Sequence, residues 1–284
     1  MPAATSSPTA KSLLLDLLST LRKGSMPVRA LLEAGSLFGI TENSLRVALT
    51  RGLVEGLLER DERGAYRLGE RARAVAERVA SWRRLEERIR PWSGAWLMVL
   101  APSRTGSRPA QRRHVRALRL FGFRELTRGV ALRPDNLTGG VDAARTELTR
   151  LELAPGSIVG ELRGLDPLTD ARARALWDAD GLVDGYRKMC RELDASARRI
   201  ATLPETAALV ESFRTGGAVL RRLTLDPLLP EPIVPAGERA ALLAAMGRYD
   251  AVGRDCWAPF LSRHGIRHRS APTDTRAHAW GDFS

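Results

Sequence analysis

The sequence has few cysteines and no segment suited to a membrane. Its two cysteines, Cys190 and Cys256, cannot build a disulfide framework, which favours a reducing cytoplasm. No run approaches the roughly 18 consecutive apolar residues that a membrane helix needs, so no membrane partner is expected. The chain does not begin with a charged leader, an apolar stretch and a cleavage site, and we predict no export signal. Residues 1–10 are expected to form a short disordered arm.

Sequence patterns of catalysis are also missing. The chain has no glycine-rich phosphate loop, no nucleophile elbow and no His-Glu-x-x-His pair. His264 and His268 are four residues apart, with Asp255 and Cys256 upstream, but this spacing matches no standard metal module. We therefore predict no catalytic residue, no metal site and no cofactor, and we expect a protein that is not an enzyme.

Positive charge, by contrast, is in excess. Lysine and arginine number 45 against 33 acidic residues, which gives a formal net charge of +12. A basic chain of this size favours a polyanionic partner such as nucleic acid or anionic lipid. Almost all of the positive charge is arginine and the chain is rich in alanine, so genome composition also contributes to it. The 284 residues, 44% of them hydrophobic, fit a globular protein of two or three domains.

The N-terminal region reads as three short helices followed by a hairpin. Leucines at helical spacing predict a first helix over 12–21, and Pro27 suits the start of a second. Thr41 is a plausible N-cap for a third helix that runs to about Gly52, with Leu45, Ala48, Leu49 and Leu53 on its inner face. Residues 57–60 and 65–68 alternate like strands around a turn at 61–64. This order predicts a winged helix-turn-helix domain over 11–70.

The rest of the chain predicts an α+β fold with two further domains. A polar helix is expected from about 69 to 90, which gives a linker helix over 71–91. Strands and helices then alternate in the β-α-β-β-α-β order of a ferredoxin-like domain over 92–166. The segments that carry this order are 96–100, 110–121, 123–126, 130–133, 141–151 and 157–162. Helices at 171–200, 205–223 and 238–261 predict an α-helical C-terminal domain over 167–262, followed by a mobile tail over 263–284.

The third helix carries the candidate DNA-reading residues. A helix that enters the major groove packs one side on its domain and offers short polar groups and cations on the other. The candidate residues on this helix are Asn43, Ser44, Arg46, Val47, Thr50 and Arg51. The hairpin adds Arg60, Arg63 and Arg67 as a wing suited to a phosphate strand. The alternative is that both are solvated faces of a small helical domain; their order along the chain favours DNA.

Four more arginines, at 112, 113, 116 and 119, occupy the predicted helix after Pro109. They suit an anionic ligand or a second stretch of DNA, but a solvated helix face is the favoured interpretation.

Several segments resemble the PaaX family of transcriptional repressors, named for the phenylacetate degradation pathway. They are FGITENSLRVAL at 38–49, EGLL at 55–58, GAYRL at 64–68, WSGAW at 92–96, GF at 122–123, LRPDNL at 132–137, LW at 176–177, Tyr186 and DPLLP at 226–230. The resemblance implies the three domains described above and a homodimer that represses transcription at palindromic sites. It also implies release from DNA by a small effector, an aryl acyl-CoA such as phenylacetyl-CoA. No family motif places that effector on particular residues of this chain.

Two other functions remain as alternatives. The middle domain is similar to small CRISPR-associated ferredoxin-like endonucleases, which would make the protein a metal-dependent nuclease. Those enzymes carry an aspartate at the end of their first strand, whereas the corresponding segment here, 99–103, reads VLAPS and has no carboxylate. The third interpretation is a scaffold whose winged helix binds protein.

Overall fold

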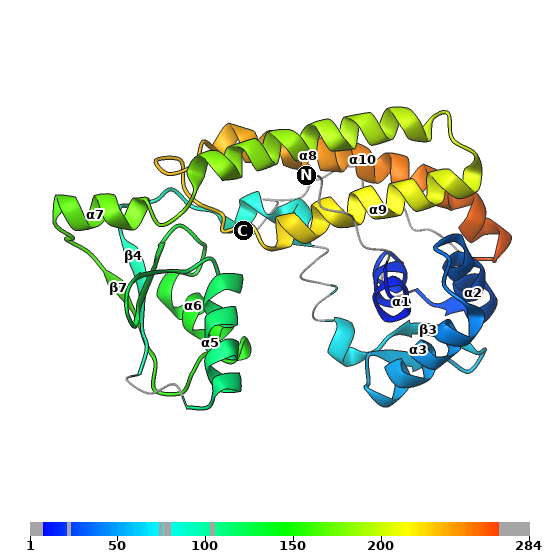
Figure 1. Cartoon of the computed structure of the whole chain (residues 1–284), viewed down its shortest axis with the longest axis horizontal. Helices are drawn as coiled ribbons and strands as arrows, with labels where there is room; N and C mark the ends of the chain where they lie inside the picture. The colour runs from blue at the N-terminus through cyan, green and yellow to red at the C-terminus, as the bar shows by residue number, and fades with distance from the viewer. Residues whose placement is uncertain (1–7, 22–23, 74–75, 77–80, 103–105, 267–284) are drawn as a thin grey trace, which may run out of the picture. The chain divides into compact units, whose positions relative to one another are not determined.

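The structure is a computed structural model that describes residues 8–21, 24–73, 76, 81–102 and 106–266. The chain divides into two compact units. The first contains the described residues within 1–77, 199–214 and 251–284, and the second contains those within 78–198 and 215–250. Figure 1 labels helices and several of the strands of both units. With helices and two antiparallel sheets, the chain has the expected α+β class.

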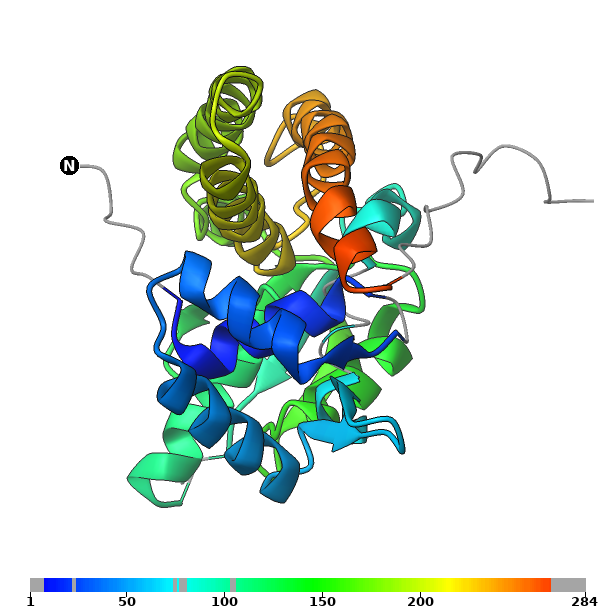
Figure 2. The same cartoon turned by 90° about the vertical axis from the view of Figure 1, so that its right-hand side faces the viewer.

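The first unit begins with three helices close to their predicted positions. They are α1 (Ala10–Ser19), α2 (Val28–Leu37) and α3 (Glu42–Val54), drawn in blue shades in Figure 2. Of the expected disordered arm, only residues 8–10 are described. Thr9 caps α1, and Ala10 is the first residue of that helix. Thr41 caps α3 as predicted, because its side chain accepts a hydrogen bond from the backbone N–H of Ser44.

A three-stranded antiparallel sheet follows these helices. Strands β2 (Leu58–Arg60) and β3 (Ala65–Leu68) form the predicted hairpin. The sequence analysis missed strand β1 (Met26–Pro27), which pairs with β3 on its other side and gives the order β1-β3-β2. A strand of only two residues is too short to show the alternation of apolar and polar residues by which strands are recognised in a sequence.

The core of the first unit draws on the C-terminal helices as well as on α1–α3. Its buried residues include Leu209 from α9 (Glu205–Thr224) and Phe260 and Leu261 from α10 (Ala236–Arg263). Phe38 contacts Phe213 edge-on, with 5.0 Å between ring centroids. Helices expected in a separate domain over 167–262 therefore contribute to the packing behind the N-terminal helices.

The second unit begins with two short 3-10 turns at Ser81–Arg84 and Glu86–Arg88. The sequence predicted one continuous helix from about residue 69 to residue 90. Residues 70–73 and 76 are helical as predicted, but from residue 81 on the segment is not α-helical. Ile89 instead forms an isolated bridge with Leu137, and Arg90 N–H donates to the carbonyl of Asn136. These contacts hold the segment in extended conformation before the sheet.

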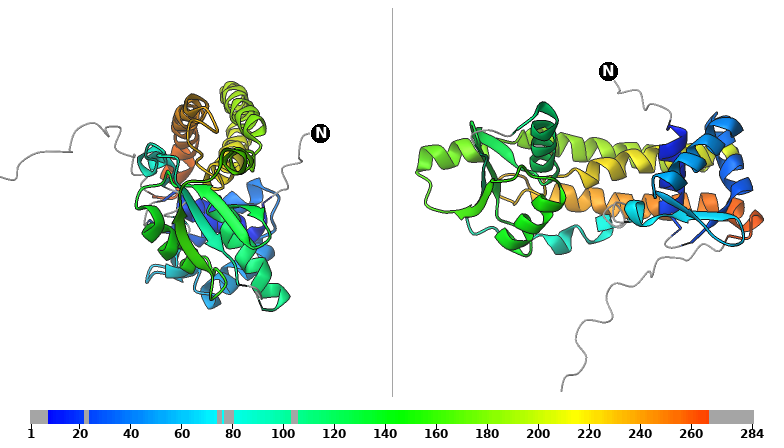
Figure 3. Two further views of the ribbon diagram at one scale, coloured as in Figure 1. Left: turned by 90° about the vertical axis from the view of Figure 1, so that its left-hand side faces the viewer. Right: turned by 90° about the horizontal axis from the view of Figure 1, so that it is seen from below.

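A four-stranded antiparallel sheet organises the second unit. Its strands are β4 (Trp96–Leu100), β5 (Arg124–Thr127), β6 (Val130–Pro134) and β7 (Ile158–Leu162), in the order β5-β6-β4-β7. Helices α5 (Arg108–Leu120) and α6 (Gly140–Arg150) lie on one face of this sheet (Figures 1 and 3). The strand and helix order is the predicted one, with bounds shifted by two residues or fewer.

The helix predicted over 171–200 is two helices. α7 (Pro167–Arg174) ends before Trp177, and α8 (Ala179–Ile200) starts after Asp178. The break has a local cause, because the Asp178 carboxylate accepts the backbone N–H of Gly181 at 2.9 Å and so caps a new helix. Among the described helices, none has the length and apolar character to cross a membrane. Residues 267–284 of the expected tail lie outside the described residues.

Candidate nucleic-acid interface

Helix α3 is anchored through its inner face. Leu45 is 0% exposed and Leu49 2% exposed, and both belong to the core of the first unit. Gly35 on α2 lets the two helices approach closely, since a Cβ at that position would lie 2.1 Å from Leu45 Cδ1. Leu53, expected on the inner face, is 36% exposed and lies at its margin. In the last turn the inner face is instead continued by Gly52, which is buried against Leu58.

The outer face of α3 places all six predicted reading residues at the surface. Asn43, Ser44, Arg46, Val47, Thr50 and Arg51 are exposed. Arg46 forms an ion pair with Glu42, 2.6 Å between its guanidinium nitrogen and the carboxylate, and both side chains are more than half exposed. Thr50 Oγ1 donates to the carbonyl of Arg46, and Ser44 Oγ accepts from Thr41. The side chains of Asn43 and Arg51 make no hydrogen bond or ion pair with any described residue.

The hairpin presents its three arginines outward as predicted. Arg60, Arg63 and Arg67 are exposed. Asp61 shapes the turn, because its Oδ1 accepts the backbone N–H groups of Arg63 and Ala65 at 3.0 and 2.8 Å. The hydrogen bond from Ala65 is also the main reason why the pKa of Asp61 is lowered.

The charges within this surface balance. From residue 41 to residue 68 the chain holds five arginines, and it also holds five carboxylates, at 42, 55, 59, 61 and 62. Several are paired locally: Arg67 lies 2.9 Å from Glu59, and Arg46 contacts Glu42. The segment 41–68 thus offers specific donors and acceptors with no net charge of its own, and Lys11 and Arg73 from outside it also pair with Glu55 and Glu59.

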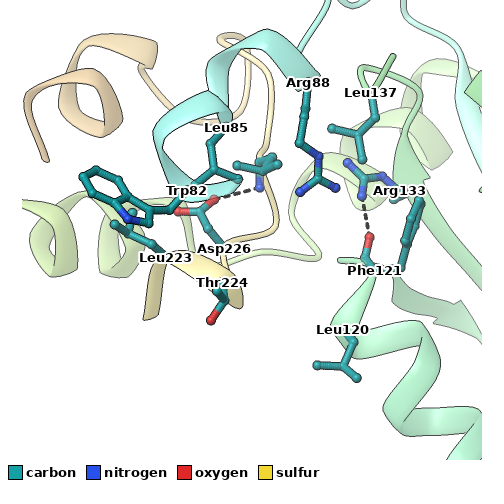
Figure 4. Close-up of a pocket in the computed structure, with 11 residues that line it drawn as sticks. Trp82, Leu85, Arg88, Leu120, Phe121, Arg133, Leu137, Leu223, Thr224 and Asp226 are labelled. Carbon is teal, nitrogen blue, oxygen red and sulfur yellow. Dashed lines mark hydrogen bonds between the residues drawn. The ribbon is translucent and has the colours of Figure 1, made fainter. Parts of the chain in front are cut away.

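The second unit contains a small pocket with an accessible volume of about 30 Å³ (Figure 4). Its apolar and aromatic lining includes Trp82, Leu85 and Phe121, and its polar lining includes Arg88, Arg133 and Asp226. The sequence analysis named no residue of this pocket as a binding residue, because its lining comes from segments far apart in the chain.

Arg133 is the unusual group in the pocket wall. Its guanidinium is buried and donates to the carbonyls of Phe121, Pro134 and Pro227 and to Asn136 Oδ1. Burial lowers the pKa of Arg133 to about 9. Asn136 Nδ2 also donates to the carbonyl of Leu228, so two of the sequence motifs, 132–137 and 226–230, are packed against each other.

The histidine pattern near the C-terminus gives no metal centre among the described residues. His264 Nε2 lies 3.0 Å from Glu33 Oε2, and His268 lies outside the described residues. Within the described part of the chain, no group of three or more His, Cys, Asp or Glu side chains is arranged to hold a metal ion.

Comparison with known proteins finds a family match for the N-terminal region. Residues 9–72 match the family model described as PaaX-like protein, in agreement with the resemblance seen in the sequence. A similar solved structure is an uncharacterized protein, Rv0674, from Mycobacterium tuberculosis. It is 29% identical, with a TM-score of 0.58, over 86% of this chain and 98% of that one. No curated protein matches the sequence.

Proposed function

We propose that the protein is a transcriptional regulator that binds double-stranded operator DNA through α3 and the β2–β3 hairpin. The match of residues 9–72 to the PaaX-like family supports a regulator of that type. The observation that carries the proposal is the two-sided character of α3: Leu45 and Leu49 anchor it, while all six reading residues are exposed. In this proposal the first unit is a winged helix and the sheet of the second unit is ferredoxin-like.

The outer face of α3 suits the major groove, which admits one α-helix. Arg46 is held only by an exposed ion pair with Glu42, and such pairs contribute about 0–1 kcal/mol, so Arg46 is easily released toward a base or phosphate. Val47, 41% exposed, offers an apolar contact for a thymine methyl group. The hairpin arginines Arg60, Arg63 and Arg67 then lie along a phosphate strand.

We further propose a homodimer that represses transcription at palindromic sites. One winged helix reads only a few base pairs, and two-fold pairing doubles the length of the site. The four-stranded sheet supports this, because register partners Leu100 and Ile158 are apolar yet 39% and 60% exposed. Ile158 lies on β7, an edge strand of that sheet, where a second copy has access.

A small effector such as an aryl acyl-CoA completes the proposal as the signal that releases DNA. The pocket in Figure 4 is the proposed contact point for part of such a molecule, because aromatic side chains and two arginines line it. Binding an aryl group there requires the pocket to open, because its accessible volume of about 30 Å³ is smaller than the roughly 150 Å³ of a cavity that takes up benzene. An apolar body suits Trp82 and Phe121, and an anionic or carbonyl group suits Arg88.

The test is a selection from random double-stranded DNA, followed by binding measurements on the selected sequence and on the promoter upstream of the protein's own gene. We expect sequence-specific binding that weakens as salt rises. Arg46→Ala and Arg51→Ala should each weaken specific binding by about 1–3 kcal/mol if they contact bases. Arg29→Ala, an exposed arginine on α2, is the matched control and should leave specific binding unchanged.

Two results would reject the proposal in different ways. Failure of the wild-type chain to select any sequence would reject DNA reading and favour a protein-binding scaffold. Selection of a sequence that Arg46→Ala and Arg51→Ala bind as tightly as the wild type would reject α3 as the reading helix.

A further inference from the structure

The net positive charge of this chain lies outside the proposed reading segment 41–68. Between residues 41 and 68, arginines and carboxylates are equal in number. Helix α5, in contrast, carries arginines at 108, 112, 113, 116 and 119 and has no acidic residue along its 13 residues. Phosphate neutralisation supplies essentially all non-specific DNA affinity and a large share of specific affinity. A reading segment whose own charges balance is therefore poorly equipped to supply that part of binding by itself.

Four of these arginines form a continuous stripe. Arg108, Arg112, Arg116 and Arg119 are spaced by four, four and three residues, which places them on one face of the helix. The buried residues of α5, His114 and Ala117, lie on a different face. The sequence analysis missed Arg108, because it began this helix at residue 110.

The stripe has no partners within the part of the chain that the structure describes. All four arginines are exposed, and none of them forms an ion pair or hydrogen bond with a described residue. Only Arg113, beside the stripe, approaches a carboxylate, 3.6 Å from Glu152. Arg124 adds a further cation nearby. The pKa of Arg124 is lowered mainly by its burial and, to a smaller extent, by the charge of Arg119.

This arrangement costs stability that no ion pair with a described residue offsets. Like charges three or four residues apart on a helix destabilise it by about 0.2–0.5 kcal/mol per pair. The stripe contains three such pairs. A row of cations with a helical rise of about 6 Å between members matches the regular negative charge of a nucleic-acid backbone better than it matches a single anion.

We propose that the stripe on α5, formed by Arg108, Arg112, Arg116 and Arg119, is a second DNA-contacting surface that binds the phosphate backbone of the operator. This proposal rests on the proposed function. It assigns sequence reading to α3 and a large share of the salt-dependent affinity to α5. Guanidinium groups bind phosphate through charge-assisted hydrogen bonds, and these contacts carry no sequence information.

The experiment compares two quadruple variants of the full chain. The first is Arg108→Gln, Arg112→Gln, Arg116→Gln and Arg119→Gln together. The matched control is Arg172→Gln, Arg191→Gln, Arg198→Gln and Arg221→Gln, which removes the same charge from exposed arginines elsewhere in the second unit. For each protein, the dissociation constant for the selected operator and for an unrelated duplex is measured across a range of salt concentrations.

We expect the α5 variant to bind both duplexes at least tenfold more weakly at low salt. The slope of log K against log salt should fall by up to about 3.6, at roughly 0.9 for each phosphate that is no longer neutralised. The ratio of operator to unrelated-duplex affinity should stay the same, and the control should keep the wild-type slope. Lysine at all four positions should restore most of the slope, because lysine retains the charge.

Equal slopes for the α5 variant, the control and the wild type would overturn the inference and leave the proposed function intact. Equal weakening in the α5 variant and the control would also overturn it, since the effect would then be one of overall charge. Loss of sequence preference in the α5 variant would assign base reading to α5 and contradict the division of roles. A wild-type chain that binds no DNA would overturn both proposals together.

Discussion

The contact between α2 and α3 at Gly35 offers a sharp test of how the proposed reading helix is held. A Cβ on Gly35 would lie 2.1 Å from Leu45 Cδ1 and 3.1 Å from its Cγ, in a core where Leu45 is 0% exposed. Overpacking of this kind costs about 1–3 kcal/mol. The higher helix propensity of alanine offsets about 1 kcal/mol of that cost. Gly35→Ala should therefore lower the free energy of unfolding by roughly 0–2 kcal/mol.

Shortening Leu45 should reverse the sign of this effect. Leu45→Ala alone is expected to cost about 2–5 kcal/mol, because it empties part of the core. In that background a methyl group at position 35 meets no leucine, so Gly35→Ala should stabilise by about 1 kcal/mol. The two substitutions are thus coupled by about 1–3 kcal/mol.

Urea unfolding of the wild type, both single variants and the double variant, followed by far-UV circular dichroism, measures this coupling. Gly247→Ala is the matched control, since a Cβ at that helical position meets nothing within 4 Å. It should stabilise the protein equally in the wild-type and Leu45→Ala backgrounds. Additive effects of Gly35→Ala and Leu45→Ala, within about 0.5 kcal/mol, would refute the close packing of α2 on α3.

Three further predictions concern single side chains. Thr41→Ala removes the N-cap of α3 and should lower thermal stability by about 1 kcal/mol, whereas Thr41→Ser should not; equal melting temperatures would contradict the cap. His114 is buried, and burial lowers its pKa from 6.5, so the unfolded chain takes up its proton first and stability should fall as pH drops below 6.5. The Nδ1 atom of His114 accepts a hydrogen bond from the backbone N–H of Ala154, and His114→Gln keeps an acceptor there but does not titrate. The melting temperature of this variant should therefore change less than that of the wild type between about pH 5 and 7, the range where histidine titrates. Tyr186→Phe removes the hydroxyl that donates to the partly buried Asp226 carboxylate at 2.6 Å and should cost about 1–3 kcal/mol in urea unfolding; an unchanged midpoint would show that Asp226 does not depend on it.

Local signals in the sequence were sufficient for most of the elements and for the outer face of α3. Thr41 as a cap, the leucine spacing and the turn at 61–64 are each decided by residues within a few positions of one another. Strand β4 has the bounds that its apolar run predicts, Trp96–Leu100. The exposure of the nine predicted reading and wing residues likewise follows from helical and strand periodicity.

The features that the sequence did not predict depend on distant parts of the chain. Met26 becomes a strand residue only because it pairs with Tyr66, and the packing of Leu209 and Phe260 behind α1–α3 requires helices more than 130 residues away. The pocket wall is similar, since Arg133 is held by the carbonyl of Pro227. The break at Asp178 was a local signal, an aspartate able to cap the next helix, that the apolar periodicity on either side concealed.

Photo-crosslinking from the outer face of α3 tests most directly whether this face enters the DNA groove. A photoreactive phenylalanine analogue replaces Val47, which is 41% exposed, and in a second protein it replaces Leu168 on α7, which is 72% exposed. With operator DNA bound, we predict crosslinks from position 47 to bases within the selected site and none from position 168. A protein that still binds the operator but crosslinks to DNA from neither position, or from position 168 alone, would contradict the placement of α3 in the groove.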